Sequence, residues 1–74
     1  MNATRRVWIE HVAATGAIAR LHLAPPPAAQ RTPRGHVLSE LELDAHALSR
    51  IWQYRVEGGR LVLDRAAIFR ATVG

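Results

Sequence analysis

The side chains of this 74-residue chain that could support catalysis are four histidines and a few hydroxyl residues, because cysteine is absent. A nucleophile needs a general base beside it and a third group that orients the base. His46 lies shortly before Ser49 and shortly after Asp44, so a helix here would place His46 and Ser49 on one face. Asp44 is better suited to cap that helix, which commits its carboxylate to the backbone. We therefore expect no catalytic residue and no enzymatic activity.

The same histidines do not form a metal-ligand pattern. Ligands of structural zinc sites come in pairs about two to five residues apart. His11, His22, His36 and His46 are separated by 11, 14 and 10 residues, and there is no thiolate to complete a site. We expect no metal ion, no cofactor and no small-molecule substrate.

All ten basic side chains are arginines, which with six acidic residues give a formal net charge of +4. The arginine fork suits both phosphates and carboxylates, so a small nucleic-acid-binding module is one interpretation. The side chains that would contact nucleic acid are Arg5, Arg6, Arg31, Arg34 and, by stacking on a base, Trp8. Against this, acidic residues are interspersed among the arginines, and a genomic preference for arginine codons would produce the same composition. Nucleic-acid binding is therefore the alternative function.

Residues 24–35 contain all four prolines of the chain and two arginines. Proline lacks the N–H that a sheet requires and favours extended, polyproline II geometry. Twelve residues without secondary structure are many for so small a domain. The segment is either a flexible connector or an arm that docks on a partner. The residues of such an arm are Pro25, Pro26, Pro27, Arg31, Pro33 and Arg34.

Residues 51–64 are typical of a β-hairpin. Gly58-Gly59 predicts a two-residue turn in which both central residues have positive φ. Folding there places Glu57 opposite Arg60 and gathers the apolar side chains on one face. A slip of one residue would destroy that pattern, so the register is well specified.

Residues 5–23 predict a second hairpin around a three-residue loop, Ala14-Thr15-Gly16. The pairs expected across its strands are Ala13 with Ala17, His11 with Ala19, Ile9 with Leu21, Val7 with Leu23, Glu10 with Arg20, and Trp8 with His22.

Alternating residues from His36 to Leu43 predict a strand, with Glu40 and Glu42 on its polar face. Asp44 then caps a short helical turn over residues 45–49. The tail, residues 65–74, fits either a final strand, which its alternation favours, or a helix capped by Asp64.

Together these patterns predict one mainly β domain over residues 1–74. It consists of a small antiparallel sheet of about five strands, in a sandwich or open barrel, with one short helical turn. The expected core comprises Val7, Ile9, Leu21, Leu23, Val37, Leu41, Leu43, Ile51 or Trp52, Tyr54, Val56, Leu61, Leu63 and Phe69.

Short amphipathic strands, a thin core and a proline-rich arm favour a non-enzymatic structural or assembly subunit that docks on a larger protein assembly. A virion head or tail accessory protein is one example. The expected partners are other copies of the chain or other protein subunits. No apolar run approaches the roughly 18–20 residues that span a membrane, and Glu10 and His11 interrupt any signal peptide after Arg5-Arg6. We expect a cytoplasmic protein, or one incorporated into a particle assembled in the cytoplasm.

Overall fold

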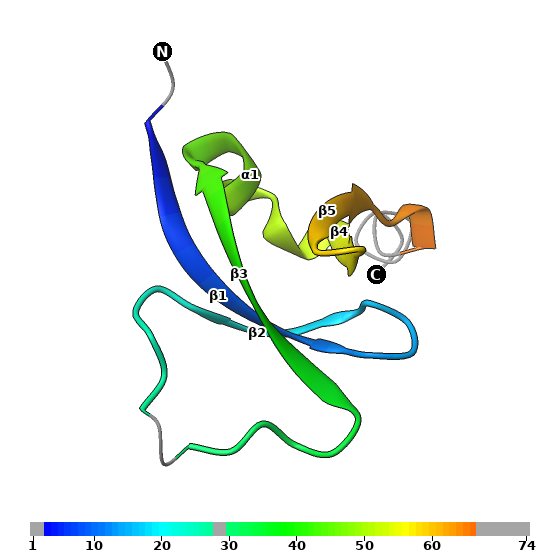
Figure 1. The fold of residues 1–74 in the computed structure, drawn as a ribbon. Helices are drawn as coiled ribbons and strands as arrows, with labels where there is room; N and C mark the ends of the chain where they lie inside the picture. The colour runs from blue at the N-terminus through cyan, green and yellow to red at the C-terminus, as the bar shows by residue number, and fades with distance from the viewer. Residues whose placement is uncertain (1–2, 28–29, 67–74) are drawn as a thin grey trace.

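Two antiparallel sheets, a five-residue helix and a 3-10 turn form the fold in the computed structural model, which describes residues 3–27 and 30–66. Strands β1 (Thr4–Val12), β2 (Ile18–His22) and β3 (His36–Asp44) form one sheet in the order β2-β1-β3. Helix α1 (Ala45–Ser49) and turn η1 (Ile51–Gln53) lead to the hairpin of β4 (Tyr54–Glu57) and β5 (Arg60–Leu63). The mainly β prediction, with five strands and one short helical turn, is confirmed (Figure 1).

The β4–β5 hairpin has the register expected from the sequence. Glu57 pairs with Arg60, and the ladder continues to Tyr54 opposite Leu63. Gly58 and Gly59 have φ values of 60° and 78°, as the two central positions of a type I′ turn require. The turn chemistry alone was enough to specify this pairing.

The β1–β2 hairpin confirms part of its predicted register. Trp8 pairs with His22, Ile9 with Leu21 and Glu10 with Arg20. Nearer the turn the prediction is wrong, because the register shifts after Glu10 and His11 lies opposite Ile18 rather than Ala19. Val12, not Ala13, is bonded to Ala17, so the loop has four residues, 13–16. The predicted Val7–Leu23 pair also does not form, since β2 ends at His22.

The loop differs because it contacts the second hairpin. The Val56 N–H donates to the Gly16 carbonyl oxygen at 2.9 Å, and Ala17 forms an isolated bridge with Arg55. Gly16 is buried and has a φ of 77°. These backbone contacts join the β1–β2 loop to β4, so the two sheets are linked rather than independent units.

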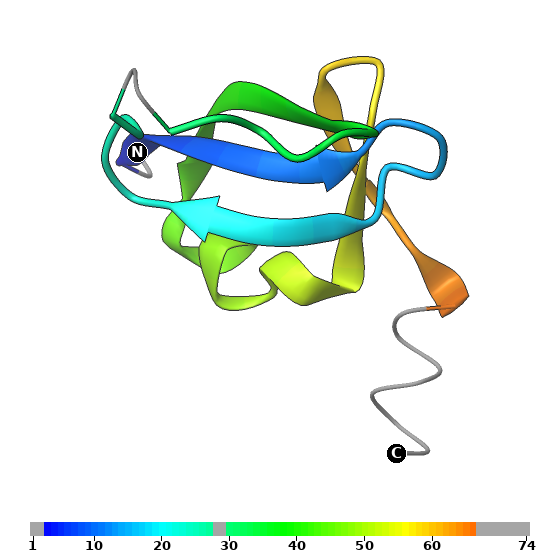
Figure 2. The same cartoon turned by 90° about the horizontal axis from the view of Figure 1, so that it is seen from below.

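Strand β3 pairs with β1 along nine residues, from Thr4 opposite Asp44 to Val12 opposite His36. The Asp44 carboxylate then accepts a hydrogen bond from the Ala47 N–H at 2.8 Å and caps α1, as predicted. Helix α1 and the β4–β5 hairpin lie on one side of the three-stranded sheet, and residues 23–27 and 30–35 lie on the other side (Figures 1 and 2).

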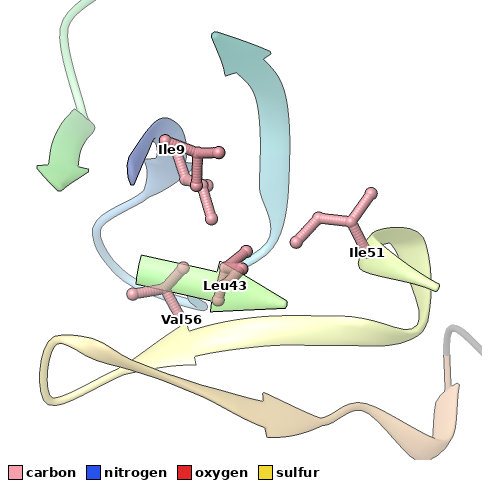
Figure 3. Close-up of a cluster of buried hydrophobic side chains, with 5 residues drawn as sticks. Ile9, Leu43, Ile51 and Val56 are labelled. Carbon is pink, nitrogen blue, oxygen red and sulfur yellow. The ribbon is translucent and has the colours of Figure 1, made fainter. Parts of the chain in front are cut away.

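The core lies between the three-stranded sheet and the segment from α1 to β5. The buried apolar residues among those described are Val7, Ile9, Leu43, Ile51 and Val56 (Figure 3). Leu21, Leu41 and Leu61 pack against them, as do three residues that the sequence pattern did not single out: Ile18, Ala47 and Leu48.

Three predicted core residues are instead exposed. Leu23, 51% exposed, lies beyond the end of β2, and Val37 (44%) lies near the start of β3. Leu63 (54%) ends β5, away from the buried Val56. Of the pair left open, turn η1 buries Ile51 and leaves Trp52 59% exposed.

The tail prediction falls mostly outside the described residues, as does Phe69. Arg65 and Ala66 are helical, and an Asp64 carboxylate oxygen accepts from the Ala66 N–H at 3.1 Å. The described part of the tail therefore follows the helix-cap alternative rather than the strand that alternation favoured.

Candidate docking surface

The proline-rich segment lies across the face of the β2-β1-β3 sheet that points away from the core. We call this the reverse face; it carries Trp8, Glu10, Arg20, His22, Leu38, Glu40 and Glu42. A cavity of about 20 Å³ separates sheet from segment and is lined by Glu10, His22, Leu38, Pro26, Gln30, Arg31 and Thr32. That volume is room for about one water molecule. The segment and the reverse face are therefore one continuous surface.

Backbone hydrogen bonds fix the second half of this segment. The Gln30 N–H donates to the Pro27 carbonyl at 2.9 Å, and the His36 N–H donates to the Pro33 carbonyl at 3.0 Å. The Ala13 N–H donates to the Gly35 carbonyl at 2.8 Å, which ties the segment to the end of β1. Arg31 and Arg34 are both exposed between these attachment points.

A buried carboxylate lies beneath the segment. Glu10 is only 4% exposed, and its Oε2 lies 2.8 Å from Nδ1 of His36. Burying a carboxylate without a partner is costly, so His36 is a structural requirement of this arrangement. Sequence reasoning missed the pair, because alternation placed Glu10 on a strand face without showing that the proline-rich segment covers it.

The remaining carboxylates of the chain are also engaged. Glu40 and Glu42 both contact the Arg6 guanidinium, at 3.0 and 3.7 Å. Glu57 accepts from Arg55 at 2.8 Å, while Asp44 and Asp64 accept from backbone N–H groups. As a result, seven arginines form no ion pair with another described residue: Arg5, Arg20, Arg31, Arg34, Arg50, Arg60 and Arg65.

The residues predicted for nucleic-acid contact lie in separate environments. Arg6 is held by two carboxylates, and its neighbour Arg5 donates to the Leu23 carbonyl at 3.2 Å. Arg34 adjoins the opposite end of β1, where Val12 pairs with His36. At about 3.3 Å per residue, the two ends of β1 are roughly 25 Å apart. Trp8 is half-buried and lies between His22 and Glu40 in the sheet register.

The arm residues themselves are on the surface. Pro26 is half-buried against the cavity, and the others are exposed: Pro25, Pro27, Arg31, Pro33 and Arg34. The described arm thus presents its two arginines outward and one proline inward.

Among the described residues, one serine side chain contacts a histidine side chain, and the two residues are not the His46 and Ser49 that the sequence suggested. His11 Nε2 lies 2.9 Å from Ser39 Oγ, on the core face of the sheet. His11 is buried, and its Nδ1 has no hydrogen-bond partner among the described residues. A catalytic histidine is usually oriented through that second nitrogen. Ser49 instead donates to the His46 carbonyl at 2.8 Å, within α1.

A wider groove of about 300 Å³ lies between the β1–β2 loop and the β4–β5 turn. Its lining includes His11, Thr15, Arg55 and Glu57, together with glycines of both turns. The Arg55 guanidinium donates to the Glu57 carboxylate along β4, on the wall of this groove. Within residues 3–27 and 30–66, no three histidine or acidic side chains cluster closely enough to hold a metal ion. No helix in those ranges is long and apolar enough to cross a membrane.

Comparison of the chain with protein-family models, curated proteins and solved structures gives no match.

Proposed function

We propose that this chain is a non-enzymatic assembly subunit that docks on a larger protein assembly through its β-rich body and its proline- and arginine-rich arm, residues 24–35. The observation that carries the proposal is the reverse face: exposed Leu38 lies beside Arg31, and the arm arginines have no carboxylate partner among the described residues. Arginine with apolar neighbours is the composition enriched at protein interfaces. A virion head or tail is one assembly of this kind.

The small core supports the same proposal. Five apolar residues are buried among those described, while Trp52, Leu63 and Leu23 are each more than half exposed. A domain of this size buries only about 60% of the surface of its unfolded chain, so its own core stabilises it weakly. Covering such side chains against a partner would add stabilisation of about 25 cal/mol per Å² of apolar area.

The proposal is tested by removing the arm. Residues 25–33 are replaced by a six-residue Gly-Ser linker. The linker must connect the end of β2 to the start of β3. These two points are separated by about 10 Å across two strand spacings and by about 13 Å along β1, which together give roughly 16 Å. Six extended residues span that distance easily. We expect the circular dichroism spectrum to persist, while the oligomer or complex seen by size-exclusion chromatography with light scattering is lost.

The matched control replaces the same nine positions with a Gly-Ser sequence of equal length, which keeps the connection but removes the prolines and Arg31. It should lose assembly as the shortened variant does. A wild-type chain that stays monomeric and captures no protein in pull-down would refute the proposal. Loss of folding in both variants would show that the segment is part of the core.

Nucleic-acid binding is the second candidate, favoured by the seven arginines that lack a carboxylate partner among the described residues. It is tested on nuclease-treated protein with a mixed oligonucleotide in the same chromatography. A monomer that shifts on adding the oligonucleotide would favour this candidate. A defined oligomer that ignores the oligonucleotide would favour assembly.

A further inference from the structure

The positive charge of the reverse face is concentrated on one side of it. Arg20 lies opposite Glu10 in the sheet register, and Arg31 lines the cavity above Glu10. The Glu10 carboxylate is buried and paired with His36, so it does not neutralise either arginine at the surface. Leu38, 37% exposed, lines the same cavity. Arg34 is exposed three residues after Arg31 in the arm. We call Arg20, Arg31, Arg34 and Leu38 the arm patch.

The other side of the same face is acidic. Glu40 and Glu42 are both exposed, and a single guanidinium, that of Arg6, lies between them. Glu40 is also the sheet neighbour of Trp8, the aromatic side chain of the reverse face and the one that the sequence suggested for stacking on a base. A nucleic-acid strand that stacked on Trp8 would bring its phosphates beside these carboxylates, which like-charge repulsion disfavours.

A protein partner avoids that conflict. Its acidic side chains need not be evenly spaced as phosphates are, so they can lie next to Arg20, Arg31 and Arg34 and away from Glu40 and Glu42. Carboxylates match the arginine fork in a bidentate geometry, and an apolar side chain between them would cover Leu38. The arm holds Arg31 and Arg34 between backbone hydrogen bonds at Gln30 and His36, which limits the ordering that binding requires.

We propose that the arm patch binds a carboxylate-rich segment of a protein partner, with acidic side chains on the arginines and an apolar side chain on Leu38. This inference rests on the proposed docking function and specifies the chemistry of the partner. Charge complementarity, rather than apolar area, selects the partner at this surface.

The test measures binding of fluorescein-labelled decaglutamate and of a labelled deoxythymidine decamer by fluorescence anisotropy, at about 50 mM salt, where screening is modest. The variants are Arg31→Glu with Arg34→Glu, and a control of equal charge change, Arg50→Glu with Arg60→Glu. All four arginines are exposed, and the control pair lies after α1 and at the β4–β5 turn. If the charge reversal disturbs folding, the double variant Arg31→Gln with Arg34→Gln replaces it, because it removes both charges without reversing them.

We expect the arm variant to raise the Kd for decaglutamate about tenfold and the control to change it less than about twofold, because each reversal at the patch replaces an attraction with a repulsion. Equal losses in both variants would mean that net charge alone binds the peptide, which overturns the inference. No decaglutamate binding by the wild type, or tighter binding of the deoxythymidine decamer that is lost in the arm variant, would also overturn it. If any of these results is obtained and arm deletion still abolishes assembly, the docking function is supported although this partner chemistry is wrong.

Discussion

Gly16→Ala is the sharpest perturbation of this fold, because Gly16 is where the two hairpins meet. Its φ of 77° is in the left-handed region, and a Cβ there would overlap the Val56 carbonyl oxygen and lie 3.1 Å from the Val56 carbonyl carbon. These atoms are backbone, so no rotamer change relieves the overlap. The Val56 N–H also donates to the Gly16 carbonyl, and Val56 is a buried core residue.

Three contributions set the size of the effect. A non-glycine residue in left-handed geometry costs about 1–2 kcal/mol. Losing the hydrogen bond between Val56 and Gly16 costs about 0.5–1.5 kcal/mol. Partial withdrawal of Val56 from the core forfeits about half of the roughly 1.5–3 kcal/mol that burying such a side chain contributes. We expect Gly16→Ala to lower the free energy of unfolding by about 2–5 kcal/mol, a large share of the roughly 4–11 kcal/mol typical for this length.

Gly59→Ala is the matched control. Gly59 has a φ of 78°, but nothing lies within 4 Å of the position that its Cβ would occupy. It should therefore lose only the backbone contribution of about 1–2 kcal/mol. Urea unfolding followed by tryptophan fluorescence measures both variants. If Gly16→Ala destabilises the protein no more than Gly59→Ala does, the contact between the hairpins does not hold the fold together.

Three further substitutions test other parts of the structure in the same unfolding assay. Ile9→Ala should lower the free energy of unfolding by about 2–5 kcal/mol, whereas Leu23→Ala, at an exposed position, should change it by less than about 0.5 kcal/mol; equal effects would contradict the observed core. His36→Ala leaves the Glu10 carboxylate buried without its partner and should cost about 1.5–3 kcal/mol, and rescue by Glu10→Gln in the double variant would confirm the pairing. Asp44→Ala removes the α1 cap and should cost about 1 kcal/mol, with Asp44→Asn retaining most of it; no difference between the two would argue against capping.

The candidate surface was only partly predictable. The arm residues could be identified from composition, because all four prolines and two arginines fall within twelve residues. The contact between Glu10 and His36 could not, since it joins residues 26 positions apart and depends on the β1–β3 register, in which Glu10 pairs with Leu38 and Val12 with His36. The contact between His11 and Ser39, 28 positions apart, depends in the same way on the β1–β3 register.

Elements whose geometry is local were predictable from the amino-acid pattern. Gly58-Gly59 selects its turn because glycine alone adopts positive φ without strain, and the turn then sets the β4–β5 register. Asp44 caps α1 by accepting a hydrogen bond from Ala47, only three residues later in the chain. Alternation likewise identified β3 and its two faces, since side chains on a strand must point to opposite sides.

Features that depend on contacts between distant segments became visible in the folded chain alone. The β1–β2 loop is one residue longer than its turn signal implies, because Gly16 and Ala17 also bond to β4. Leu23, Val37 and Leu63 alternate in phase with the core but are exposed, since they lie near strand ends that no other described element covers. Periodicity specifies which face a side chain occupies, whereas burial requires a second element above that face, and the position of that element is set by the packing of the whole chain.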